Sequence, residues 1–190
     1  MCTFAATAIV LPQQAEATDK VVLDSSAFEP NGPIPAKHTC EGADVSPALT
    51  WSGVPSGTKS LALIFDDPDV PDPAAPKRTW VHWVLYDVPP STRGLREAIG
   101  ANSLPSGTRE GFNDWKRTGY GGPCPPIGRH RYFFTLYALD TVPDGVRLLG
   151  IEPTDNVAVG DLMDILGIPA SLGQDEQRVA AKVVEATPDR

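Results

Sequence analysis

The pattern of apolar and polar positions predicts short β-strands along much of the chain. Residues 49–51 form one short strand, and residues 60–65 are a continuous apolar run that suits a buried strand. The prolines and aspartates of residues 66–73 remove ladder donors and resist burial, so they are predicted to end that strand. The carboxylates of Asp67 and Asp69 are therefore expected at a strand end.

Two later runs have a period of two, and each contains a histidine. In residues 80–86 this period predicts that the even-numbered positions share one face, with Val81, Trp83 and Leu85 on the other. Both faces are largely apolar, so His82 must find a hydrogen-bond partner or border a cavity. In residues 130–139 the same period places His130 on one face together with Tyr132, Phe134, Leu136 and Ala138.

The connections between these strands are long and irregular. Residues 91–118 are polar and contain glycine, and loops of this length in compact domains are often functional. Residues 119–128 are rich in glycine and proline, which predicts a fixed loop with exposed backbone amides. Towards the C-terminus, Thr154 or Asp155 caps a predicted helix that ends at Gly167, and a second helix is expected over about residues 175–186.

Composition indicates one soluble domain. The 190 residues are 41% hydrophobic and 21% charged, and 20 prolines with 17 glycines favour turns and short strands over long helices. We expect a leader at residues 1–18 and a single domain at residues 19–190. The net charge of −8 argues against a general nucleic-acid or anionic-membrane binder, because both need a basic surface.

The leader leaves the compartment open. Residues 2–11 are apolar and residues 15–17 have the A-x-A form of a signal-peptidase site, but a basic n-region is missing. The protein is cytoplasmic as the chain is given, and periplasmic or secreted if residues 1–17 end a signal peptide. No apolar run approaches the roughly 20 residues of a transmembrane helix, so none is predicted. Cys40 and Cys124 either pair in an oxidising compartment or are buried free thiols.

Two of the three histidines, His82 and His130, lie beside carboxylate-rich or glycine-rich loops. A phosphate site needs donors such as imidazole N–H groups, loop amides near Gly122 and a hydroxyl such as that of Tyr132. Asp67 would accept a histidine ring proton, keep the ring protonated, or receive an ammonium group. The alternative is that both histidines are core residues bonded to backbone, while the aspartates cap turns.

Five segments, residues 46–51, 66–71, 80–83, 119–126 and 130–132, resemble signature blocks of the phosphatidylethanolamine-binding protein family, in its bacterial and archaeal Raf kinase inhibitor-like branch. Their order and spacing match across about residues 28–140. The resemblance implies a mainly β fold, an antiparallel Greek-key β-sandwich with peripheral C-terminal helices. Relatives commonly end in a Gly-Thr-Tyr segment near the pocket, whereas this chain has no tyrosine after Tyr137. Its tail, residues 167–190, departs from the family pattern.

The resemblance also implies a small pocket for anions. Its expected lining is Asp67, Trp80, His82, Gly122, His130 and Tyr132. Asp69 and Pro123 are expected to support the pocket loops. Arg131, which the period of the strand places on the face opposite His130, is predicted to be the structural partner of a buried carboxylate.

The expected function is a soluble protein that binds phosphate, phosphoethanolamine or a phospholipid head group, without a cofactor, and that regulates a protease or kinase partner. One alternative is a serine protease inhibitor of the same family. Another is a small-molecule enzyme that uses Asp67 with His82 or His130 in acid–base work. Two histidines and one carboxylate also match a facial metal triad, but the family requires no metal, so none is predicted. Cys124 lacks a nucleophile-elbow pattern, and no catalytic residue is predicted.

Overall fold

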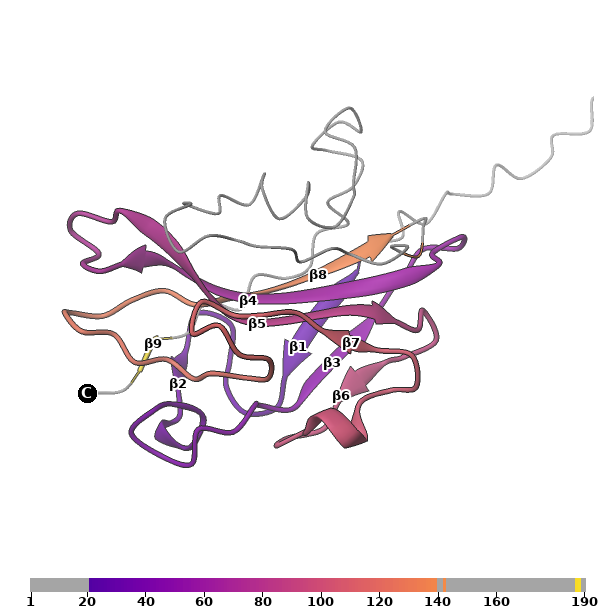
Figure 1. The fold of residues 1–190 in the computed structure, drawn as a ribbon, viewed down its shortest axis with the longest axis horizontal. Helices are drawn as coiled ribbons and strands as arrows, with labels where there is room; N and C mark the ends of the chain where they lie inside the picture. The colour runs from indigo at the N-terminus through magenta and orange to yellow at the C-terminus, as the bar shows by residue number, and fades with distance from the viewer. Residues whose placement is uncertain (1–20, 140–141, 143–186, 189–190) are drawn as a thin grey trace, which may run out of the picture.

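The computed structural model describes residues 21–139, 142 and 187–188 (Figure 1). One antiparallel sheet has β3 (Leu49–Ser52) between β1 (Val22–Ser25) and β6 (Gly94–Leu95). The other antiparallel sheet contains, in spatial order, β7 (Arg109–Glu110), β5 (Arg78–Val88), β4 (Ser60–Val70) and β8 (Phe133–Leu139). The remaining elements are β2 (Pro33–Ile34), which pairs in parallel with β9 (Thr187–Pro188), and the 3₁₀ turns η1 (Ala36–His38) and η2 (Ala101–Ser103). The predicted mainly β fold class is confirmed.

The main core lies between the two sheets. In β3, Leu49 and Trp51 are buried while the residues between and after them are exposed, because successive side chains point to opposite faces. These two side chains belong to the same buried cluster as Leu63, Trp83 and Phe134 of the four-stranded sheet. The three-stranded sheet therefore buries one face, and Val22, Thr50 and Ser52 are exposed on the other.

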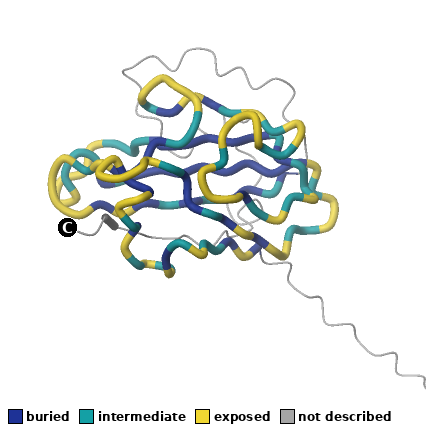
Figure 2. Tube along the Cα trace, turned by 90° about the horizontal axis from the view of Figure 1, so that it is seen from below, coloured by how far each residue is buried: buried dark blue, intermediate teal, exposed yellow. Residues whose placement is uncertain are grey.

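The four-stranded sheet is buried on both faces. Its second face holds a separate buried cluster that includes Ile64, Val84, Tyr86, Tyr137 and Leu139. In Figure 2 the long central strands are dark blue along most of their length, whereas the connecting loops are largely yellow. Burial on both faces explains why these strands read as nearly continuous apolar runs, as the sequence predicted for residues 80–86.

The predicted alternation along residues 80–86 is wrong at one point. Phe65 pairs with Trp83, but the next residue of β4, Asp66, pairs with Val81, so that His82 is an extra residue in a β-bulge. Val81 consequently joins the cluster on the second face, instead of sharing a face with Trp83. The bulge allows two neighbouring side chains, those of His82 and Trp83, to lie on the inner side of the sheet.

The predicted end of the strand at Asp66 is also wrong. β4 continues to Val70 and includes Pro68, but its pairing with β8 stops at Asp66. Beyond that residue β4 pairs with β5 alone, and its register shifts between Asp67 and Val70. Proline is tolerated in a strand at an irregular edge, because no ladder donor is needed there.

The predicted strand of residues 130–139 begins later than expected, at Phe133, while its alternation is as predicted. The two predicted C-terminal helices and the leader lie outside the described residues. The described part of the tail, β9, pairs with β2. Among the described residues there is no helix of the length and apolarity that crossing a membrane requires.

Candidate functional site

Three segments far apart in sequence meet where β4 and β5 leave the double-layered part of the fold. In Figure 1 the β4–β5 connection and the loop that precedes β8 project from the same end of the sheet. Gly128 of that loop approaches the ring of Pro73 in the connection, since a Cβ built on Gly128 would lie 3.3 Å from Pro73 Cγ. Asp67, His82, His130 and Tyr132 gather at this end, and we call these four residues the histidine site.

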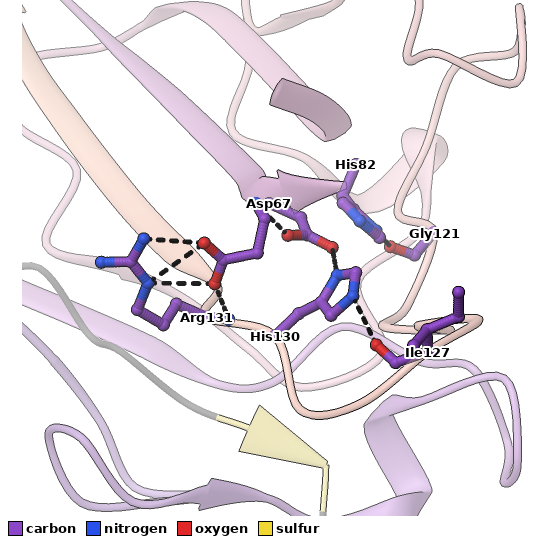
Figure 3. Close-up of polar contacts among 7 residues, drawn as sticks. Asp67, His82, Gly121, Ile127, His130 and Arg131 are labelled. Atoms are coloured by element: carbon purple, nitrogen blue, oxygen red, sulfur yellow. Dashed lines mark hydrogen bonds and ion pairs between the residues drawn. The ribbon is translucent and has the colours of Figure 1, made fainter. Parts of the chain in front are cut away.

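Asp67 and His130 form a buried pair at the centre of the site. Asp67 Oδ2 lies 2.7 Å from His130 Nδ1, and the two residues are 2% and 0% exposed. The other ring nitrogen, Nε2, lies 3.0 Å from the carbonyl oxygen of Ile127, so Nε2 must be a donor (Figure 3). Burial raises the pKa of Asp67, against the opposing effect of the His130 contact. Because Nε2 donates to Ile127, the 2.7 Å contact between Nδ1 and Asp67 Oδ2 requires one proton between these two atoms, so the pair as a unit carries no net charge.

His82 sits in the bulge and is held by the loop that follows residue 119. Its Nδ1 donates to the carbonyl of Gly121 at 2.7 Å, and the amide of Gly121 donates back to the carbonyl of His82 at 3.2 Å. Burial lowers the pKa of His82 to about 4, so the ring is neutral at pH 7. With Nδ1 donating its proton to Gly121, Nε2 of the neutral ring is an acceptor. The sequence predicted that an imidazole N–H would donate into the site, but Nε2 of the neutral His82 ring accepts a hydrogen bond instead.

Two donors beside these histidines are buried and make no hydrogen bond of ordinary geometry in the described part of the chain. They are the hydroxyl of Tyr132, a residue with 0% exposure, and the indole N–H of Trp80. The Tyr132 ring lies 5.4 Å from the His82 ring and 6.4 Å from the His130 ring, while Trp80 is the cross-strand partner of Asp67. Burial, followed by the nearby Asp67 carboxylate, raises the pKa of Tyr132, so its hydroxyl keeps its proton. Buried polar groups are normally hydrogen-bonded, so both donors have unused hydrogen-bonding capacity beside the site.

The other two carboxylates of the segment have different surroundings. Asp69 accepts hydrogen bonds from the backbone N–H of Arg131 at 2.8 Å and from its guanidinium at 2.7 Å, and these contacts lower the pKa of Asp69. This is the role predicted for Arg131. Asp66 precedes the site in β4, and burial raises its pKa to about 7. Asp69 thus fixes the start of the 131–139 segment opposite β4.

Gly122 does not present the free amide that its glycine-rich segment predicts. Its N–H donates to Asp44 Oδ1 at 2.6 Å, and a Cβ on Gly122 would lie 2.4 Å from the carbonyl oxygen of His38. The glycine is needed because two backbone segments approach closely, not because the loop offers a donor. Pro123 accepts a hydrogen bond from the Cys40 amide at 3.1 Å, which ties the same loop to residues 36–44.

A disulfide joins these two segments next to that hydrogen bond. Cys40 and Cys124 are bonded, with their Cα atoms 5.5 Å apart, across 84 residues of sequence. Both residues are exposed, so they are not buried free thiols. The disulfide holds the loop whose carbonyls, at Gly121 and Ile127, orient the two site histidines.

The model of the phosphatidylethanolamine-binding protein family matches residues 24–175, more than half of the chain and all of the site. The chain belongs to the phosphatidylethanolamine-binding protein family. The family predicted from the sequence is thereby confirmed.

Relatives agree with this family assignment. The chain is 53% identical over 123 residues to a UPF0098 protein of Methanothermobacter thermautotrophicus, a match that covers 64% of this chain and 78% of the relative. It is 47% identical over 131 residues to a UPF0098 protein of Aquifex aeolicus, covering 68% and 71%. The crystal structure of the family homolog CT736 from Chlamydia trachomatis superposes with a TM-score of 0.66 at 30% identity, covering 91% and 99% of the two chains. The structure of Escherichia coli YbcL gives 0.66 at 28% identity, covering 90% and 99%.

One residue beside the site of this family member was not found from the sequence. Trp115 lies in the long loop between residues 91 and 118, with its ring 4.9 Å from the His82 ring and 5.4 Å from the Trp80 ring. The length of the loop is a sign of function, but its residues show no periodicity that would select Trp115. In the part of the chain that the structure describes, no group of three or more His, Cys, Asp or Glu side chains is arranged to hold a metal ion.

Proposed function

We propose that the histidine site binds a phosphate-bearing anion, such as inorganic phosphate, a phosphomonoester or a phospholipid head group. The observation on which this rests is the pair of buried, unpartnered donors, Tyr132 Oη and Trp80 Nε1, beside His82. A phosphate oxygen accepts hydrogen bonds from both kinds of donor. Placing an acceptor there would remove the cost of two unsatisfied buried groups, which is typically about 1–3 kcal/mol each.

The charges near the site support an anion. The Asp67–His130 pair is neutral as a unit, and Asp69 is bonded to Arg131, so neither carboxylate opposes a negative ligand strongly. The flanking loops are basic. Residues 71–80 and 111–131 contain six lysines and arginines but only two acidic residues, whereas the whole chain has 16 lysines and arginines and 24 acidic residues. A local positive field attracts anions even when the whole protein is acidic.

The sharpest test removes one hydroxyl group. Tyr132→Phe deletes Oη and leaves the ring, and we expect it to weaken phosphate binding by roughly 10-fold or more, the value of a hydrogen bond to a charged acceptor. The same change should leave the unliganded protein as stable or more stable, because it removes an unsatisfied buried donor from the core. Calorimetric titration with inorganic phosphate and phosphoethanolamine measures the binding, and urea unfolding measures the stability.

Tyr86→Phe is the matched control, since Tyr86 is also buried but lies in the cluster on the other face of the sheet. It should leave phosphate affinity unchanged. Equal phosphate affinities for wild type and Tyr132→Phe would show that the Tyr132 hydroxyl does not contribute to binding. A loss of stability in Tyr132→Phe that matches its loss of binding would mean that Tyr132 is structural.

The neutral state of His82 gives the binding a specific pH dependence. Because the pKa of His82 is about 4, its Nε2 accepts a hydrogen bond at higher pH, and the ligand must supply that proton. A phosphomonoester has such a proton below its second pKa of about 6. Above that pH each binding event takes up one proton, so affinity should fall about tenfold per pH unit between pH 6.5 and 8.5. Titrations in two buffers of different ionisation enthalpy measure the proton uptake; a pH-independent affinity would contradict the assignment.

Regulation of a protein partner, inhibition of a serine protease and acid–base catalysis stay predictions from the sequence. None of the contacts at the histidine site favours one of them over the others.

A further inference from the structure

The loop of residues 111–119 is organised around one buried side chain. Asn113 is 2% exposed; its Nδ2 donates to the carbonyls of Gly119 and His82 at 3.1 and 3.3 Å, and its Oδ1 accepts from the amides of Trp115 and Arg117 at 3.0 and 3.3 Å. The backbone N–H of Asn113 donates to the carbonyl of Arg117 at 2.9 Å. All hydrogen-bonding groups of this amide are therefore used inside the loop or on β5. The loop is built to present the residues between 113 and 117 in one fixed conformation.

What the loop presents is a large aromatic surface at the edge of the histidine site. Trp115 is 40% exposed although its ring contacts those of His82 and Trp80 edge-on. A Cβ on Gly121 would lie 2.5 Å from Trp115 Cζ3, so the loop that holds His82 has a glycine where the indole passes. An exposed tryptophan leaves apolar surface in contact with water, which is unfavourable unless another group packs on it. Here the loop that Asn113 fixes holds the indole in this exposed position.

The charged groups around this indole are cationic or neutralised. The guanidinium of Arg117 lies 5.7 Å from the Trp115 ring centroid, and that of Arg78 lies 4.5 Å from the Trp80 centroid. The nearby carboxylate of Asp114 has both oxygens occupied, one by Arg78 at 2.7 Å and one by the Val81 amide at 2.6 Å. A ligand ammonium would meet two guanidinium groups here and no free carboxylate of this loop. An uncharged planar group would meet a stacking surface.

We propose that Trp115 forms a subsite for the organic part of the ligand and selects phosphomonoesters with an aromatic substituent over those with an ammonium group. The proposal rests on the proposed function, because the phosphate itself is held by the histidine site. The ring of the ligand packs on the exposed part of the indole, beside the guanidinium of Arg117, which lies 5.7 Å from the ring centroid. Stacking of two aromatic rings is worth about a fivefold gain in affinity.

Four probes of graded chemistry test the subsite by calorimetric titration: inorganic phosphate, ethyl phosphate, phenyl phosphate and phosphoethanolamine. Wild type should bind phenyl phosphate about fivefold more tightly than ethyl phosphate, and phosphoethanolamine no more tightly than ethyl phosphate. Trp115→Leu, which keeps apolar cover on His82, should bind phenyl and ethyl phosphate equally while its affinity for inorganic phosphate stays within twofold of wild type. Phe112→Ala is the matched control, because Phe112 is a 54% exposed aromatic residue of the same loop. It should keep the preference for phenyl phosphate.

The outcomes separate this inference from the function on which it rests. Binding of inorganic phosphate with equal affinities for phenyl and ethyl phosphate would overturn the subsite alone, as would a phenyl preference that survives in Trp115→Leu. Failure of all four probes to bind wild type would overturn the proposed function and the subsite with it.

Discussion

Replacing His130 by alanine is expected to destabilise the native state by roughly 3–5 kcal/mol at pH 8, the range measured when one member of a buried ion pair is removed. His130 is fully buried, and its ring nitrogens contact Asp67 Oδ2 at 2.7 Å and the Ile127 carbonyl at 3.0 Å. The alanine variant leaves the Asp67 carboxylate buried without its main partner. Urea unfolding followed by circular dichroism measures the loss.

The pH dependence of this loss identifies its cause. In the variant, Asp67 keeps a pKa that burial raises and loses the opposing contact, so its folded-state pKa lies above its unfolded value. Such a group costs little stability below its unfolded pKa of about 4 and progressively more as pH rises through the folded pKa. The defect should therefore be smaller at pH 4.5 than at pH 8. An equal defect at both pH values would mean that lost packing, and not a stranded carboxylate, is responsible.

Two further variants isolate the pair. In a double-mutant cycle, Asp67→Asn combined with His130→Ala should lose less stability than the sum of the two single changes, because each single change strands the partner. His38→Ala is a control for losing a buried histidine, since His38 is 2% exposed but its Nδ1 contacts the carbonyl of Val45, at 2.8 Å, and not a buried carboxylate. The loss of stability caused by His38→Ala should be the same whether residue 67 is Asp or Asn.

Phe65→Ala is expected to cost about 3–5 kcal/mol and to change the titration of His82. Phe65 is fully buried, with its ring stacked 4.0 Å from that of Phe134 and 5.4 Å from that of Tyr120. The same ring lies 5.1 Å from the His82 ring, so its removal opens space beside the imidazole. Since burial holds the pKa of His82 near 4, access of water should raise that pKa towards the usual 6.5. NMR titration of the histidine ring protons measures the change.

Leu61→Ala separates the two consequences of Phe65→Ala. Leu61 is fully buried in the same cluster and on the same strand, but it pairs with Val88 at the opposite end of β5 from His82. Its truncation should cost about 2–5 kcal/mol and leave the pKa of His82 where it was. A shift of that pKa in both variants would show general loosening of the core, in which case Phe65 would have no particular role at the site.

The fold was largely predictable because burial on two faces leaves a strong pattern. The continuous apolar run of residues 60–65 and the alternation after His130 each correspond to a strand of the four-stranded sheet. Strand boundaries were less predictable, since they depend on the neighbouring strand with which each strand pairs. β4 passes Asp66 because β5 still pairs with it, and β8 begins at Phe133 because the amide of Arg131 donates to the Asp69 carboxylate and not to a strand.

The chemistry of the site depended on contacts that a linear pattern does not contain. The bulge at His82 arises from a register shift between two strands, and no single strand's period reveals it. Gly122 was expected to offer its amide to an anion, but the fold brings Asp44, 78 residues earlier in sequence, to within 2.6 Å of that amide. Trp115 reaches the site because Asn113 fixes its loop to β5.

By itself, the sequence determined that the chain is a mainly β member of this family, and it predicted which residues would line an anion site. These properties follow from local composition, hydrophobic period and motif spacing, which can be read from the sequence alone. The tertiary structure alone decided how protons are placed: His82 is neutral with Nε2 as an acceptor, both ring nitrogens of His130 are occupied by Asp67 and Ile127, and the Tyr132 hydroxyl makes no hydrogen bond of ordinary geometry. The physical reason is that protonation depends on burial and on the identity of the nearest oxygen atom, and both are set by segments that only folding brings together.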